Sequence, residues 1–205
     1  MKSIQFASER VYPSKVVCVA RNYLGHIREL GNAIPERPVL FIKPNSAITD
    51  ALVLPSDETM GYEGEICFLI RNNTFCGVGF GLDLTKRAVQ SELKQKGLPW
   101  ERAKAFDCSA VLSEFVPFEG ETAGLSLRLT INGNIVQAGG VEGMINSPKA
   151  VLAETLSFLS LEENDVLMTG TPEGVGTVKL GDMFVGQIFL GETLLVERQW
   201  LVSSL

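Results

Sequence analysis

The stretch GYEGEICFLI (61–70) places two glutamates, Glu63 and Glu65, directly before an apolar run. Such a run is typical of a buried strand. Side chains alternate along a strand, so both carboxylates point to one face with their Cβ atoms roughly 7 Å apart. In a low dielectric the two charges repel each other unless a proton or a cation intervenes. The pair therefore indicates either part of a divalent-metal site or two solvent-facing carboxylates at the start of an edge strand.

A third acidic residue, Asp83, lies inside the apolar segment GFGLDLT (79–85). A buried carboxylate needs a partner, which could be a capping interaction, a salt bridge to Arg87, or a metal ion. Three inward carboxylates completed by water match the hard oxygen coordination of Mg²⁺ or Mn²⁺. His26 is the only histidine, which excludes the usual catalytic zinc sets. Any metal here should be Mg²⁺, Mn²⁺ or Ca²⁺.

Two further groups could take part in catalysis. His26 and Glu29 are three residues apart, so on a helix they are neighbours. A histidine held by a carboxylate can act as a general base near neutral pH, although an ordinary surface pair is favoured on these residues alone. Lys104 lies between Trp100 and Phe106, where it could extend along the aromatic rings to solvent or stabilise an anion.

The glycine-rich segment TGTPEGVG (169–176) follows a predicted strand. It lacks the G-K-[ST] ending of a P-loop, which argues against nucleotide phosphate binding. Its backbone N–H groups and the hydroxyls of Thr169 and Thr171 could hold a carboxylate. A plain turn is equally compatible with the segment.

Hydrophobic periodicity and turn residues predict the elements that must position these groups. Asn22, Thr85 and Ser147 are the expected helix caps, and tight turns are expected at 71–73, at 132–134 and around Gly191. The predicted helices cover 23–30, 85–96 and 148–158, and the predicted strands cover 16–20, 39–42, 51–54, 63–70, 78–84, 125–131, 135–137, 165–168, 184–189 and 193–198. Strict β-α-β alternation is absent, so we expect one α+β domain over 1–205 that is rich in strands and mostly antiparallel.

Composition narrows the class of protein. The chain has 205 residues, 45% of them hydrophobic, and a net charge of −6 without any Lys/Arg run. This disfavours nucleic acid and anionic membranes as partners. The four cysteines form no CxxC pair, the N-terminus is too charged for a signal peptide, and no apolar stretch approaches a membrane span. We therefore expect a cytoplasmic protein.

Taken together, these segments resemble the fumarylacetoacetate hydrolase superfamily, in particular its short members of the acylpyruvase and oxaloacetate-handling type. Their order and spacing carry the resemblance across most of the chain, while no single segment would. The matching segments are ARNYLGHIRELGN (20–32), PVLFIKP (38–44), YEGEICFLI (62–70), GLDLTKRAVQ (81–90), KGLPWERAKAFD (96–107), INGNIVQ (131–137) and ENDVLMTGTPEGVG (163–176). The acid-bearing strands are separated here by a short segment, RNNTFCG (71–77), where the family usually has a longer insert.

The resemblance implies a fold peculiar to this family, a mixed β-sandwich or β-roll with few helices, and a homodimer with bound Mg²⁺ or Mn²⁺. Residue by residue, it implies that Glu63, Glu65 and Asp83 are metal ligands. His26 and Glu29 match a dyad that activates water, on a helix that resembles the family's lid. Lys104 matches the lysine beside the metal, and the substrate-contacting positions are Arg21, Gln90 and Thr171.

These matches favour a metal-dependent hydrolase that cleaves a carbon–carbon bond in 2,4-dioxo acids, such as acylpyruvates or fumarylpyruvate, through a pyruvate enolate. The same enolate arises when oxaloacetate is decarboxylated or tautomerised, which is the alternative reaction for the same residues. A different class also stays open, in which the chain is a non-catalytic member that binds a carboxylate ligand. The shortened segment 71–77 and Ala88, in place of a common acidic residue, motivate that third possibility.

Overall fold

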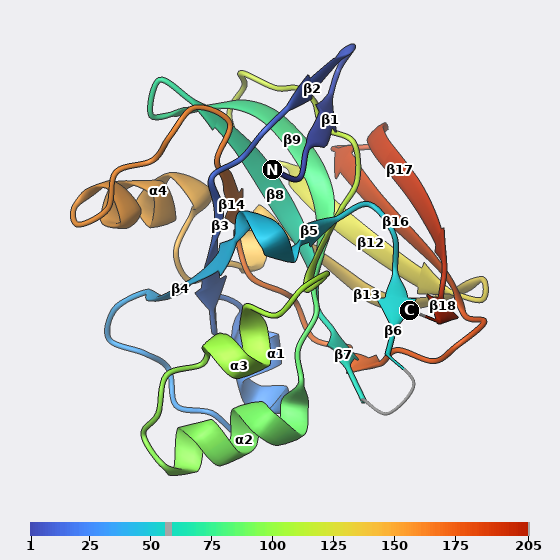
Figure 1. Cartoon of the computed structure of the whole chain (residues 1–205). Coiled ribbons are helices and arrows are strands. Elements are labelled where there is room, and N and C mark those ends of the chain that lie inside the picture. Colours follow the sequence, from blue (N-terminus) through green and yellow to red (C-terminus); the bar gives the residue numbers. More distant parts are fainter. Residues whose placement is uncertain (56–58, 205) are drawn as a thin grey trace.

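A computed structural model of the chain describes residues 1–55 and 59–204. Its largest element is a mixed sheet, called the larger sheet below, whose strands run in the spatial order β4-β3-β14-β8-β9-β10-β5, with β11 paired to β9 (Figure 1). The bounds of these strands are β3 Lys15–Ala20, β4 Val39–Pro44, β5 Ile48–Thr49, β8 Gly64–Arg71, β9 Thr74–Asp83, β10 Ala110–Leu112, β11 Val116–Pro117 and β14 Val166–Met168. Only the β10–β5 and β14–β3 pairs are parallel within it.

A second, smaller sheet is fully antiparallel and packs against one face of the larger sheet. Its strands run in the order β13 Asn134–Gly140, β12 Leu125–Ile131, β16 Met183–Leu190 and β17 Thr193–Leu201. Three short strand pairs complete the described β-structure: β1 Ile4–Phe6 with β2 Glu9–Val11, β7 Gly61–Tyr62 with β15 Gly176–Thr177, and β6 Val53–Leu54 with β18 Ser203–Ser204. The expected strand-rich, largely antiparallel α+β fold is confirmed.

The helices are short and peripheral. The described residues form α1 Leu24–Glu29, α2 Arg87–Gln95, α3 Glu101–Lys104 and α4 Pro148–Leu156, with 3₁₀ turns at Asn45–Ala47 and Val141–Gly143. Figure 1 shows α1, α2 and α3 gathered at one end of the molecule, beyond the tip of β3, while α4 lies beside β3 and β14. None of the helices in the described chain is long and apolar enough to cross a membrane.

The central strand β8 is buried on both faces, because each face of the larger sheet has its own hydrophobic core. Ile66, Phe68 and Ile70 point into the core between the two sheets. Cys67 and Leu69, on the opposite face, belong to the second core. This explains why the strand reads as a continuous apolar run rather than as an alternating one.

The predicted tight turn at 71–73 is confirmed in the hairpin that joins β8 to β9. Asn72 and Asn73 both adopt positive φ angles, of 50° and 57°. Positive φ at both central residues is the requirement of a two-residue type I′ turn, and asparagine tolerates it. The short segment 71–77 is therefore a tight turn followed directly by β9, so the loss of a longer insert leaves the strand pairing intact.

The three predicted helix caps have different outcomes. Ser147 caps α4 as expected, since its hydroxyl accepts a hydrogen bond from the Ala150 N–H. The prediction is wrong for Asn22, whose side chain donates to the carbonyls of Asn146 and Thr169 and makes no cap to α1. It is also wrong for Thr85, because α2 begins two residues later and the Thr85 hydroxyl faces the acidic cluster. In both cases a long-range contact takes the side chain away from the local one.

Other differences concern short elements. The expected strand over 51–54 is reduced to β6, and β1, β2, β5, β7, β10, β11, β15, β18 and α3 were not predicted. Most of these elements span only two to four residues. Segments of that length carry too little periodicity to be read from sequence, and they form because neighbouring strands offer hydrogen bonds.

Asp165, just before β14, links two strands of the larger sheet. Its buried carboxylate accepts hydrogen bonds from the Ser14 N–H at 2.8 Å and the Lys15 ammonium at 2.6 Å, so it ties the entry of β14 to the entry of β3. Burial alone would raise the pKa of Asp165, but the Lys15 ammonium and the backbone donors lower it below its usual value. A lowered carboxyl pKa means that the ionised form stabilises the folded state.

Replacing Asp165 with asparagine should therefore lower the free energy of unfolding at neutral pH by about 2 kcal/mol, the size of a charge-assisted hydrogen bond. The wild-type advantage is present above the unfolded-state pKa of about 4 and is lost as the pH falls through the lower folded-state pKa. Urea unfolding of both proteins between pH 3 and pH 7 measures this difference. The control is Asp50→Asn, which removes an exposed carboxylate. An Asp165→Asn deficit that stays constant with pH would contradict the prediction.

Candidate active site

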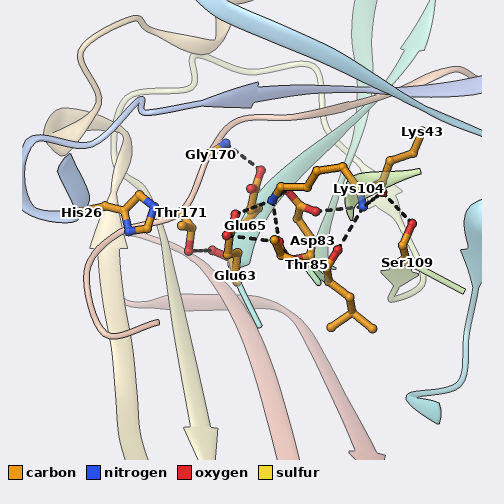
Figure 2. A network of polar contacts seen from close by, with 12 residues as sticks. His26, Lys43, Glu63, Glu65, Asp83, Thr85, Lys104, Ser109, Gly170 and Thr171 are labelled. Atoms are coloured by element: carbon orange, nitrogen blue, oxygen red, sulfur yellow. Dashed lines mark hydrogen bonds and ion pairs between the residues drawn. The ribbon is translucent and has the colours of Figure 1, made fainter. Parts of the chain in front are cut away.

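Three carboxylates converge where β8 begins and β9 ends (Figure 2). Glu65 lies in β8 opposite Gly81 of β9, and the Asp83 N–H donates to the Glu63 carbonyl at 2.9 Å. One oxygen from each of Glu63, Glu65 and Asp83 lies within 4.8 Å of the others. The predicted convergence of these three acids is thus present in the structure.

Strand alternation places all three acids on the same face. Phe80 and Leu82 of β9 point into the core between the sheets, so Asp83 points to the opposite side, as Glu65 does. On that side β9 has Gly81, whose missing side chain leaves room for the Cys67 sulfur; a Cβ there would lie 2.5 Å from it. The acids consequently occupy the one end of this face that the second core leaves open.

Two buried lysines balance the acidic cluster. Lys104 is only 2% exposed, and its ammonium donates to Glu63 Oε2 at 2.9 Å, Asp83 Oδ2 at 2.6 Å and the Thr85 hydroxyl at 2.6 Å. The possibility that Lys104 extends to solvent is therefore wrong. Lys43 is fully buried and lies 2.8 Å from Asp83 Oδ1. Asp83 is thus paired with two lysines, and not with Arg87 as the local alternative suggested.

The electrostatics of the three acids differ. Burial, reinforced by Asp83 and Glu63, raises the pKa of Glu65 well above its usual value. Burial also opposes ionisation of Glu63, but Lys104 and, more weakly, His26 lower its pKa to about 2. The pKa of Lys104 is raised, because Asp83 and Glu63 outweigh the effect of its own burial. The two lysines therefore leave Glu65 without sufficient positive charge.

This arrangement fits a hard divalent cation such as Mg²⁺ or Mn²⁺. The donors are carboxylate oxygens, which these ions prefer, and the excess negative charge around Glu65 is what a cation would relieve. Asp83 Oδ1 is buried without a hydrogen bond, since its contact with Lys43 lacks hydrogen-bond geometry. Glu63, Glu65 and Asp83 are the residues that would hold the ion.

His26 and Glu29 are brought to the same site by α1. The His26 Nδ1 atom lies 3.4 Å from Glu29 Oε2, a long contact, and the imidazole is only 6% exposed. An ordinary surface pair is therefore wrong for this histidine. Figure 2 shows the ring beside Thr171, on the same side as Glu63. Glu29 Oε1 also accepts a hydrogen bond from the Gly174 N–H at 3.1 Å, which joins α1 to the segment 169–176.

A cavity of about 30 Å³ lies between α1, α2 and the acids. It has room for a water molecule or two. Seven of the nine predicted site residues line it: Arg21, His26, Glu63, Glu65, Gln90, Lys104 and Thr171. A larger groove of about 510 Å³ runs along β4 and the segment 97–101, but it is mainly apolar and none of the three acids lines it.

The predicted substrate-contacting residues Arg21 and Thr171 differ in the hydrogen-bonding groups that they have available for a ligand. Arg21 has a positive φ of 58°, and its buried Nε has no hydrogen-bond partner in the described structure. The Thr171 hydroxyl already donates to the Gly64 carbonyl and accepts from the Gln137 amide. Arg21 can therefore donate to a ligand, whereas Thr171 can only accept through its remaining lone pair.

Three residues of the site were missed in the sequence. Lys43 ends an apolar strand on its inward side, and Thr85 was expected to be a helix cap. Lys94 lies four residues after Gln90 on α2 and lines the same cavity. The i, i+4 spacing from Gln90 was the available signal for Lys94. No local pattern identified Lys43, because its partners are 40 and more residues away.

The family profile described as "Fumarylacetoacetate (FAA) hydrolase C-terminal" matches residues 15–196. The chain belongs to the fumarylacetoacetate hydrolase family. Two relatives have closely similar sequences. Oxaloacetate tautomerase YcgM of Escherichia coli (strain K12) is 43% identical over 190 residues, which cover 83% of this chain and 87% of the relative. Human mitochondrial oxaloacetate tautomerase FAHD1 is 36% identical over 184 residues, or 82% of this chain and 83% of the relative.

A solved structure supports the same placement within the family. Fumarylpyruvate hydrolase from Pseudomonas aeruginosa, crystallised in complex with Mn²⁺ and pyruvate, superimposes with a TM-score of 0.88 at 29% sequence identity. The match covers 100% of this chain and 96% of that one. The expected family is thus confirmed, and its members bear the names of enzymes that act on small oxo acids.

The acidic cluster can be tested by metal binding. Glu65→Gln should weaken Mn²⁺ binding by more than about 100-fold, because it removes one anionic ligand from a set of three. The amide oxygen can still accept the hydrogen bond that Gly170 donates to Glu65, so the local fold should persist. Isothermal titration calorimetry measures the affinity, and the exposed Glu192→Gln is the matched control. An unchanged affinity in Glu65→Gln would mean that these acids do not form the metal site.

Proposed function

We propose that this chain is a divalent-metal-dependent enzyme that interconverts the keto and enol forms of oxaloacetate. The observation that carries the proposal is the buried cluster of three carboxylates with Lys104, which suits a 2-oxo acid whose enolate must be stabilised. The names of the two oxaloacetate tautomerases described above support oxaloacetate over the 2,4-dioxo acids that the sequence resemblance favoured. Tautomerisation was the alternative reaction for the same site.

Glu63, Glu65 and Asp83 would hold Mg²⁺ or Mn²⁺. When bound, the ion supplies Lewis-acid polarisation of the oxo group next to the substrate carboxylate. Lys104 remains protonated, because Asp83 and Glu63 raise its pKa, so it acts as a fixed positive charge and not as a base. A charge that is already oriented in a dry site stabilises the oxygen on which negative charge develops without reorganisation.

His26 is the group suited to move the proton. With Glu29 beside Nδ1, the Nε2 atom of His26 would accept a proton from C3 of the keto form. The protonated imidazole would then give a proton to the C2 oxygen, directly or through water, to form the enol, and the reverse transfers would regenerate the keto form. Glu29 also contacts the Gly174 N–H, so the orientation of His26 depends on α1 lying against the segment 169–176. Arg21 and Gln90 line the cavity as donors for the substrate oxygens.

The wild-type protein should accelerate the keto–enol interconversion of oxaloacetate with Mg²⁺, lose this activity in EDTA and regain it with excess Mg²⁺. The ultraviolet absorbance of the enol follows the reaction. The absence of any acceleration, or activity that persists in EDTA, would contradict the proposal. Glu65→Gln should be inactive at any Mg²⁺ concentration that saturates the wild type.

His26→Ala should lower the rate by about 10²- to 10⁴-fold, the usual contribution of a general base. Its Mn²⁺ affinity should match that of the wild type, because His26 is not among the three carboxylate ligands. Parallel calorimetry and enol absorbance separate the two effects. A variant with full tautomerase activity would exclude His26 as the base.

Hydrolysis of acylpyruvates is the second candidate, favoured by the likeness to fumarylpyruvate hydrolase and by the His26–Glu29 pair, which could equally activate water. Acetylpyruvate and fumarylpyruvate should be assayed by the pyruvate formed, and oxaloacetate by the absorbance of its enol, each with Mg²⁺ and with EDTA. Faster metal-dependent turnover of a dioxo acid than of oxaloacetate would favour hydrolysis. Metal-assisted decarboxylation of oxaloacetate should largely survive in His26→Ala, whereas hydrolysis should be lost.

A further inference from the structure

Three cationic side chains line the cavity beside the acids. Arg21, Lys94 and Lys104 all line it, but only Lys104 is paired with carboxylates. Within the described residues, neither Arg21 nor Lys94 forms an ion pair, and the Arg21 Nε is buried without any hydrogen-bond partner. A buried donor without a partner is costly, so an anion in the cavity would stabilise the Arg21 Nε.

Lys94 is held in place by its surroundings. It lies on α2 one turn after Gln90, on the helix face that lines the cavity, and its ammonium is 5.2 Å from the centre of the Trp100 ring. Trp100 also lines the cavity. Partial burial and repulsion from Arg21 lower the pKa of Lys94, although the nearby Glu63 carboxylate opposes this shift. Two cations are therefore kept near each other around a confined space, which is unfavourable unless an anion lies between them.

We infer that Lys94 and Arg21 form a subsite for a second carboxylate, which makes the enzyme selective for 2-oxo dicarboxylates over 2-oxo monocarboxylates. This inference rests on the proposed function, in which the carboxylate and oxo group at one end of the substrate lie at the acidic cluster. A four-carbon dicarboxylate has its second carboxylate at the opposite end of the molecule. Lys94 is thus a specificity-determining residue, and it acts on binding and not on the proton transfer.

A neighbouring lysine, Lys96 at the C-cap of α2, is an ordinary surface residue. Lys96 is about 60% exposed and pairs with Glu92 at 2.6 Å, one turn earlier. It does not line the cavity. Lys96→Met removes the same charge at the C-terminal end of α2, so it controls for any general change in the electrostatic potential around the site.

The subsite can be tested by binding alone. L-malate and L-2-hydroxybutanoate have equally long carbon chains and the same 2-hydroxy acid end, and they differ by a distal carboxylate in place of a methyl group. Calorimetric titration of the Mg²⁺-loaded wild-type protein should show preferential binding of L-malate. Lys94→Met should lower the affinity for L-malate by about 10- to 100-fold, the range of one charge-assisted hydrogen bond, and leave L-2-hydroxybutanoate unchanged. Methionine keeps an unbranched stem that can pack on Trp100.

Three outcomes would overturn the inference: no preference of the wild type for L-malate, equal losses for both anions in Lys94→Met, or the same loss in Lys96→Met. Because these titrations involve no turnover, they are independent of the reaction. Failure of the proposed function would instead appear as a wild-type protein that prefers L-malate but does not accelerate oxaloacetate tautomerisation.

Catalysis gives a second readout. Lys94→Met should raise the KM for oxaloacetate about 10- to 100-fold with little change in kcat, since the distal carboxylate is remote from the reacting carbon. Proton–deuterium exchange at C3 of 2-oxobutanoate, followed by NMR, requires the same proton transfer without a distal charge, and it should be unaffected. A fall in kcat with an unchanged KM would overturn the assignment of Lys94 to binding.

Discussion

The repulsion among three buried carboxylates is the constraint on which this site depends. Glu63, Glu65 and Asp83 lie close enough that they cannot all be ionised without added positive charge. Lys43 and Lys104 supply part of it, from opposite sides of Asp83. Because Glu65 keeps a raised pKa despite both lysines, the cluster is poised for a divalent ion, and the surrounding structure must hold the acids together against their own repulsion.

The burial of β8 on both faces helps to hold the three acids together against their repulsion. Its side chains alternate between two cores, so the strand cannot slide or rotate without exposing one of them. The tight turn at Asn72 and Asn73 fixes the register with β9, which in turn fixes Asp83 opposite the Glu63 backbone. The acids are therefore held on two strands whose register is fixed, and preorganised charges stabilise a developing charge without reorganisation.

Two short helices form the opposite wall of the cavity. The helix α1 carries His26, and a hydrogen bond from the Gly174 N–H to Glu29 joins it to the segment 169–176. The helix α2 carries Gln90 and Lys94. The acidic cluster lies on two central strands, and two small helices cover it. This arrangement suits a site that admits a ligand and then excludes water.

The sequence alone determined the longer strands, the tight turns and the three acids, because these follow from periodicity and from residues whose conformations are set by their neighbours. The roles of Asn22, Thr85, Lys43 and Lys94 were decided only by the tertiary structure. Asn22 and Thr85 have the residue types of helix caps, yet segments more than 20 residues away supply their partners. Lys43 pairs with an aspartate 40 residues further along the chain. Such pairings depend on which strands and helices pack together, and that information is absent from any local stretch of residues.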